Sequence, residues 1–143
     1  MNRFLLAVMV ILTAAVCRAE TPWSWAEKPG SLALVQGQEI AWQFNFDRQL
    51  SKPYFHPLNL PGGKTLTWVS PPDHPWHYGL WFSWKYINGV NYWEEDRQTG
   101  HSAGRTTLHN ISVTRRPDFS ARFELELEYH LPDHPPVLVE QRV

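Results

Sequence analysis

Two histidines and an aspartate lie close together in a proline-rich segment, Pro71–Gly79, with the sequence PPDHPWHYG. Pro75 disfavours helical dihedrals at His74, and the two prolines before Asp73 stiffen the approach. A restricted backbone suits a preorganised site, because a fixed group loses little entropy when it engages a ligand. His56, followed by Pro57, stands in a similar setting and is expected to meet this loop across the sheet.

Three chemistries fit these residues. His74 and His77 can act as general acid or base near neutral pH with Asp73 orienting them, and His56 completes the predicted catalytic set. The three histidines could instead bind a divalent transition metal such as zinc or iron, although no standard zinc spacing is present. In the third interpretation the imidazoles only hydrogen-bond sugar hydroxyls. A purely structural alternative is that Asp73 caps the turn and the histidines satisfy backbone carbonyls.

Aromatic and basic residues supply the predicted substrate contacts. Trp76 and Tyr78 belong to the loop itself, and Trp81 follows it directly. Indole and phenol faces can stack on the apolar faces of sugar rings, although most tryptophans in proteins simply pack. Arg105 and His109 lie at the start of a later strand, where Arg105 could clamp a carboxylate or a pair of hydroxyls. These five residues form the predicted substrate-binding set.

Acidic residues after an aromatic hairpin are weaker candidates. Glu94, Glu95 and Asp96 occupy a polar connection that runs to Gly104, and a carboxylate there could face the same pocket. Their simpler interpretation is a solvated loop.

The elements that must position these residues are strands. Period-two alternation is strict in Gln38–Phe46 and in Phe119–Tyr129, which indicates half-buried strands. Asn88-Gly89 is typical of a type I′ hairpin turn. Further strands are expected at Thr65–Val69, Leu80–Ile87, Val90–Trp93, Arg105–Arg116 and Val137–Val143, with an extended lead-in over Glu20–Gly30. No segment after residue 19 has helical periodicity, so the sequence predicts an all-β antiparallel sandwich.

The first 19 residues predict export. Arg3 precedes an apolar run from Phe4 to Val16, and Cys17-Arg18-Ala19 offers small residues at the cleavage positions. This pattern is typical of a secretory signal peptide and is too short for a membrane span. A lipoprotein signal at Cys17 is disfavoured by the bulky Val16. We therefore expect a periplasmic or secreted protein with no transmembrane span.

Charge and cysteine content narrow the function classes. Cleavage after residue 19 leaves 11 of the 13 basic residues against 14 acidic ones, a formal charge of −3. Such a surface argues against nucleic acid as a partner. Cleavage also removes the single cysteine, so the mature chain can form no disulfide. Its stability is expected to rest on core packing or a bound metal. Residues 20–143 end inside an expected strand, which predicts the N-terminal part of a larger sandwich whose missing C-terminal half completes the sheet.

The chain also resembles a known family. The carrying residues are Pro53–Leu58, Pro72–Phe82, Asn88–Trp93, Gly104-Arg105 with His109, and Pro136–Leu138 with Glu140 and Arg142. In these it is similar to the PmoA-like domain family of exported bacterial proteins, labelled "methane oxygenase PmoA" and otherwise of unknown function. Tyr78 departs from the His or Arg that the family often carries. The resemblance implies a large supersandwich, similar in outline to the galactose mutarotase-like folds. Oxygenase activity is not expected, because the chain shows neither membrane spans nor helices.

Three functions follow as hypotheses. The first is an exported carbohydrate-active domain with a His/Asp site for acid/base chemistry or sugar hydroxyl binding; as an enzyme it would be a sugar-processing epimerase, lyase or hydrolase. The second is a non-catalytic carbohydrate-binding module built on Trp76, Trp81, Trp84 and Trp93. The third is a metal-dependent enzyme with His56, His74 and His77 as ligands. A carbohydrate or another small polyhydroxylated ligand is the expected partner.

Overall fold

The computed structural model describes residues 22–143, which contain ten β-strands and no helix. The strands are β1 (Trp23–Lys28), β2 (Ser31–Gln36), β3 (Glu39–Asn45), β4 (Tyr54–Leu58), β5 (Leu80–Trp81), β6 (Tyr86–Ile87), β7 (Val90–Asn91), β8 (Arg105–Arg115), β9 (Ala121–His130) and β10 (Leu138–Arg142). No helix that could cross a membrane occurs in this part of the chain. The predicted signal peptide, residues 1–19, lies outside the described residues.

Five strands form one antiparallel sheet in the order β1-β2-β3-β4-β5. The expected lead-in before Gly30 is in fact strand β1, which pairs with β2 in a hairpin. The alternation rule missed β2 because Leu32, Ala33 and Leu34 are buried one after another. Strand β3 lies where the strict alternation placed it.

The second sheet has the order β10-β9-β8 and is also antiparallel. On β9, Leu125, Leu127 and Tyr129 are buried while the acidic residues between them face outward, as the alternation predicts. The strands predicted at Arg105–Arg116 and Val137–Val143 are confirmed as β8 and β10. The sheet therefore presents one apolar face and one charged face.

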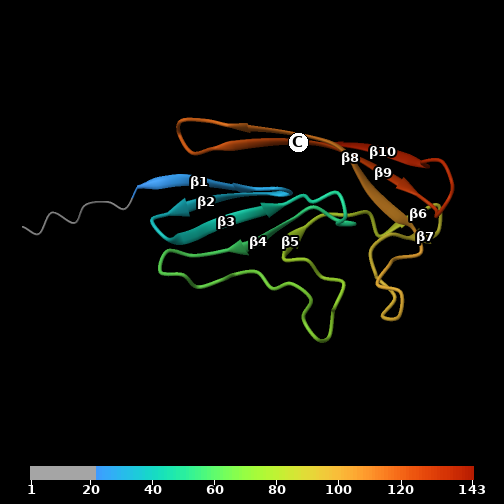
Figure 1. The fold of residues 1–143 in the computed structure, drawn as a ribbon. Coiled ribbons are helices and arrows are strands. Elements are labelled where there is room, and N and C mark those ends of the chain that lie inside the picture. Colours follow the sequence, from blue (N-terminus) through green and yellow to red (C-terminus); the bar gives the residue numbers. More distant parts are fainter. Residues whose placement is uncertain (1–21) are drawn as a thin grey trace, which may run out of the picture.

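The core lies between the two sheets, which form two layers (Figure 1). Phe44 of β3 meets Phe123 of β9 with ring centroids 4.5 Å apart, and Phe55 of β4 lies 4.6 Å from Phe44. Aromatic pairs at such separations add to the free energy gained from the area that they bury. The all-β, sandwich-like architecture expected from the sequence is confirmed.

The remaining strands are shorter than expected. Thr65–Val69 makes only isolated bridges, Asn59 with Thr65 and Val69 with Tyr78. The expected strand Leu80–Ile87 is reduced to β5 and β6, two residues each. Its side chains favour β structure, but the chain between Trp81 and Tyr86 has no partner strand. The Asn88-Gly89 turn is confirmed, with positive φ at both residues and β6 paired to β7.

Candidate functional site

Backbone hydrogen bonds close the predicted histidine loop on itself. The amide of Ser70 donates to the carbonyl of His77 at 2.8 Å, and that of Gly79 donates to Trp68 at 3.0 Å. Between these two bonds lie two successive turns. The amide of His74 donates to the carbonyl of Pro71, and the amide of His77 donates to the carbonyl of His74. The loop is therefore braced by turns as well as by its prolines.

Gly79 fixes the loop against the five-stranded sheet. Its φ is +58°, and an added Cβ would lie 3.0 Å from the Cβ of His56 and still closer to the carbonyl oxygen of Phe55. Only glycine tolerates both the left-handed backbone and this approach to β4. The loop and His56 are thus neighbours, as the sequence suggested.

The side chains of Asp73 and His74 are hydrogen-bonded to each other at the tip of the loop. The distance from Asp73 Oδ2 to His74 Nδ1 is 2.9 Å, and the two side chains are 76% and 62% exposed. The hydrogen bond from the His74 side chain is the main cause that holds the pKa of Asp73 below its ordinary value. The His74 ring also lies edge-on to Trp76, at 5.7 Å. Asp73 and His74 are therefore paired, and the pair is exposed to solvent.

The other two predicted catalytic histidines have separate surroundings. His77 is half-buried, with its ring 6.3 Å from that of Trp81. His56 Nδ1 lies 2.9 Å from the hydroxyl of Thr67. Within residues 22–143, one group of three or more ligating side chains has its donor atoms within 4.8 Å of one another, and it contains none of His56, His74 and His77. The structure does not bring these three together as a metal site.

Beneath the loop lies a buried lysine that the sequence did not single out. Lys52 is 2% exposed, and its Nζ donates to Glu95 Oε1 and to the carbonyl of Trp93, both at 2.7 Å. The same ammonium lies over the rings of Tyr78 and Trp81, 5.3 and 5.0 Å from their centroids. Lys52 is therefore enclosed by aromatic rings and one carboxylate.

Tyr78 completes this cluster from the loop side. Its hydroxyl donates to Glu95 Oε2 at 2.8 Å, so the two carboxylate oxygens of Glu95 have different partners. Burial lowers the pKa of Lys52 against the opposing effect of Glu95, and burial together with Glu95 raises the pKa of Tyr78. We call Lys52, Tyr78 and Glu95 the buried triad.

A surface hollow opens beside the buried triad, between the histidine loop and the chain after β7. It measures about 320 Å³ and is lined by Pro72, Pro75, Trp76, Glu95, Asp96, Arg97 and Gly100. We call it the loop hollow. Asp96 is held by its own loop, since its Oδ1 accepts from the amides of Gln98 and Thr99. The guanidinium of Arg97 makes no ion pair or hydrogen bond with any residue in 22–143 and can meet a ligand.

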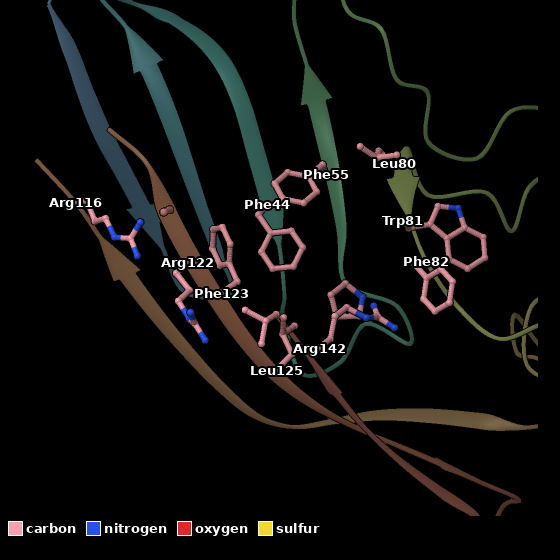
Figure 2. Close-up of a pocket in the computed structure, with 13 residues that line it drawn as sticks. Phe44, Phe55, Leu80, Trp81, Phe82, Arg116, Arg122, Phe123, Leu125 and Arg142 are labelled. Atoms are coloured by element: carbon pink, nitrogen blue, oxygen red, sulfur yellow. The ribbon is translucent and has the colours of Figure 1, made fainter. Parts of the chain in front are cut away.

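A larger groove of about 590 Å³ opens between the two sheets (Figure 2). Phe44, Phe55, Phe82 and Phe123 are among its lining residues, and three arginines lie along it: Arg116, Arg122 and Arg142. Its lining is mostly apolar and includes Trp81 of the predicted substrate-binding set, whereas the predicted catalytic residues line neither this groove nor the loop hollow. Because hydroxyl recognition needs several placed polar groups, the loop hollow suits a polyhydroxylated ligand better than this groove does.

Of the predicted catalytic and substrate-binding residues, only Trp76 lines the loop hollow. Trp81 stacks on Trp93 at 4.3 Å, and Arg105 donates from Nη1 to the carbonyl of Ser102. His109 lies on the outer face of the three-stranded sheet, near Glu128. Trp84 lies against Phe82 and does not line the hollow.

Among the acidic residues after the hairpin, Glu95 and Asp96 reach the hollow, as the weaker hypothesis suggested. Glu94 instead pairs with Lys85 at 2.8 Å. Sequence reasoning missed Lys52 and Arg97, because nothing in the local pattern separates either from an ordinary solvated cation.

The fold and this site define the class of the protein. It is an antiparallel β-protein of two main sheets, with a polar hollow on its connecting loops. The chain belongs to the family of unknown function DUF6807, whose model matches residues 31–143. Neither a curated protein nor a solved structure matches it. The matched range contains all of β2 to β10 and both loops of the hollow.

Proposed function

We propose that this domain binds a carbohydrate, or a closely similar polyhydroxylated ligand, in the loop hollow. The observation that supports this most directly is the lining itself, which combines Trp76 with Glu95 and Arg97. An aromatic face can cover the apolar side of a sugar ring, while planar charged groups accept and donate hydrogen bonds to paired hydroxyls.

Preorganisation supports the same proposal. Glu95 is fixed by Lys52 and Tyr78, and Trp76 belongs to a loop braced by turns and by Gly79. Groups that are already ordered lose little conformational entropy when a ligand binds. The predicted export of the chain and its resemblance to the PmoA-like family agree with an extracytoplasmic sugar ligand, and both remain predictions.

Binding can be tested with a glycan array, followed by calorimetric titration of the best soluble oligosaccharide. Trp76→Ala and Arg97→Ala are each expected to weaken binding at least about tenfold, equivalent to about 1.4 kcal/mol. Trp68→Ala is the matched control, because Trp68 is 64% exposed and lies outside the hollow. Equal losses in all three variants, or no binding to any glycan, would refute the proposal.

A second function, acid/base chemistry on the bound ligand, is favoured by one observation, the Asp73–His74 pair. A carboxylate at 2.9 Å from Nδ1 orients an imidazole whose Nε2 can then exchange a proton. Products should be sought by mass spectrometry after incubation with each bound glycan. Turnover that is lost in His74→Asn, with binding retained, would establish an enzyme, whereas binding without any product favours the non-catalytic module.

A further inference from the structure

A β-bulge on β8 places both His109 and Asn110 on the outer face of the three-stranded sheet. Leu108 pairs with Leu127 and Asn110 pairs with Glu126, so His109 is the extra residue between two ladder positions. Leu108 is buried, whereas His109 and Asn110 are both exposed. The bulge therefore keeps two successive residues on the outer face, beside the outward-facing side chains of β9, where regular alternation after Leu108 would have turned Asn110 inward.

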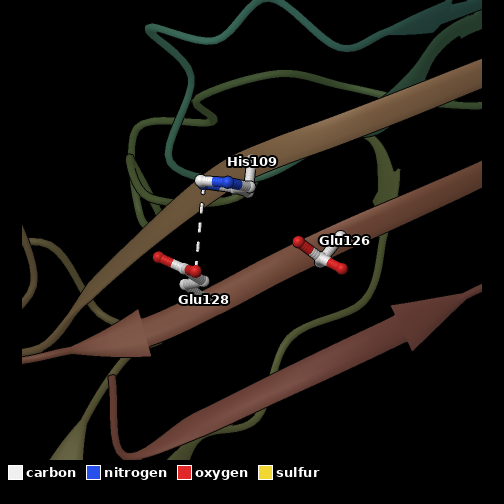
Figure 3. Close-up of side chains that lie close together, drawn as sticks. All are labelled: His109, Glu126 and Glu128. Carbon is white, nitrogen blue, oxygen red and sulfur yellow. Dashed lines mark ion pairs between the residues drawn. The ribbon is translucent and has the colours of Figure 1, made fainter. Parts of the chain in front are cut away.

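Two carboxylates of β9 face this imidazole. Donor atoms of His109, Glu126 and Glu128 all lie within 4.8 Å of one another, and His109 Nδ1 is 3.8 Å from Glu128 Oε1 (Figure 3). That separation is too long for a hydrogen bond. It is close to the spacing of two ligand atoms on one cation, since bonds of about 2.0–2.2 Å to a shared zinc ion place their donor atoms roughly 3–4 Å apart.

In the described part of the chain, the negative charges of Glu126 and Glu128 are not balanced by a neighbouring lysine or arginine. Glu126 and Glu128 are two residues apart on one strand, and within residues 22–143 neither forms an ion pair with a lysine or an arginine. Glu124, the preceding outward glutamate, does pair with Arg122, at 2.9 Å. Two adjacent carboxylates without a cation repel each other, so a bound cation would stabilise this arrangement.

Neutral amides orient one of the two carboxylates. Asn110 donates to Glu126 Oε1 at 3.1 Å, and Gln141 of β10 donates to Glu126 Oε2 at 2.6 Å. Hydrogen bonds of this kind fix the direction of a ligating carboxylate without neutralising its charge. All three strands of the sheet therefore contribute to the cluster.

We propose that His109, Glu126 and Glu128 bind a divalent first-row transition cation of the zinc type, with water at the remaining coordination positions. One imidazole and two carboxylates form a mixed nitrogen and oxygen donor set, which such ions accept and which calcium, an oxygen-selective ion, does not prefer. The site is separate from the loop hollow and does not depend on the function proposed for it.

Calorimetric titration of the untagged, chelator-treated chain with Zn²⁺ tests this site, and Co²⁺ absorption gives a spectroscopic readout of an imidazole ligand. One ion per chain is expected. His109→Ala should weaken binding at least about tenfold, and Glu128→Gln should do likewise. His134→Ala is the matched control, because His134 is exposed and lies outside the cluster.

Thermal unfolding of each metal-free variant shows whether the fold is intact, so a lost site can be told from a lost structure. Should His109→Ala fold normally and bind Zn²⁺ as the parent chain does, the proposal is wrong. Calcium binding as tight as zinc binding would also overturn it, because calcium would then be held by the carboxylates without the imidazole.

Discussion

Two acid–base pairs near the loop hollow differ sharply in burial. One includes Glu95 of the lining, and the other, Asp73 with His74, stands in sequence between the lining residues Pro72 and Pro75. The side chains of Lys52 and Glu95 are 1% and 10% exposed, whereas those of Asp73 and His74 are 76% and 62% exposed. Both pairs have short contacts, at 2.7 and 2.9 Å. Distance alone therefore does not tell what each pair does.

Burial separates their roles. Removing one partner of a buried pair leaves an uncompensated charge in a medium of low polarity, so Lys52 and Glu95 are held together whatever else the site does. Water screens an exposed pair, which contributes little to stability but remains accessible to a ligand. We infer that the buried pair positions the carboxylate of the hollow and that the exposed pair is the one free to react.

The largest effect is expected from Lys52→Met. With Glu95 left buried and without its cation, the free energy of unfolding should fall by about 3–5 kcal/mol in urea denaturation. Lys85→Met is the matched control, since it removes the exposed partner of Glu94 at a similar distance of 2.8 Å. An equally small loss in both variants would abolish the distinction drawn here.

Gly79→Ala should detach the loop from β4. The added methyl meets the carbonyl of Phe55 and the backbone is left-handed, so a loss of about 3 kcal/mol in unfolding free energy is expected. Gly89→Ala shares the positive φ but has open space around it, and should cost only about 1 kcal/mol. Similar losses would mean that backbone conformation alone, without the close contact, explains the effect.

Tyr78→Phe removes the hydroxyl that donates to Glu95 and should cost about 2 kcal/mol at neutral pH. Because the pKa of Tyr78 is raised in the folded chain, its contribution is complete below the unfolded pKa of about 10 and is lost above it, as the unfolded state releases its proton first. The stability gap between the parent chain and Tyr78→Phe should therefore narrow from pH 9 to pH 11. A gap that stays constant would contradict the raised pKa of Tyr78.

The smallest effect concerns the exposed pair. His74→Ala should raise the pKa of Asp73 toward its ordinary value, because the side-chain hydrogen bond of His74 is the main cause that lowers it. Carboxyl NMR titration measures the change, and the unfolding midpoint in urea should barely move. A large loss of stability in this variant would mean that the pair supports the fold after all.

Local patterns in the sequence predicted the parts of the fold that local chemistry determines. Alternation located β3 and β9, Asn88-Gly89 located a hairpin, and prolines delimited the histidine loop. Strand β2 was missed because its buried residues are contiguous, and the segments around β5 were overestimated because aromatic residues favour strands even without a partner.

The site was predictable only in part, since its decisive contacts join distant residues. Trp76 and Asp73 were identifiable from composition and proline placement, but Lys52 meets Glu95 across 43 residues of chain. A lysine next to a proline looks the same in sequence whether it is solvated or buried. Arg97 likewise gains its significance only from the loop that lies opposite it.

The loop hollow also has a consequence for how such a domain can diversify. Its lining comes from two connections that lie outside the paired strands, and Glu95 alone among the lining residues belongs to the buried triad. If the hollow binds the proposed ligand, substitutions at Trp76, Arg97 or Gly100 should alter ligand preference while the layered framework stays intact. In the proposed function, a change of ligand on this scaffold then needs new side chains only at those positions, while Glu95 stays held by Lys52 and Tyr78.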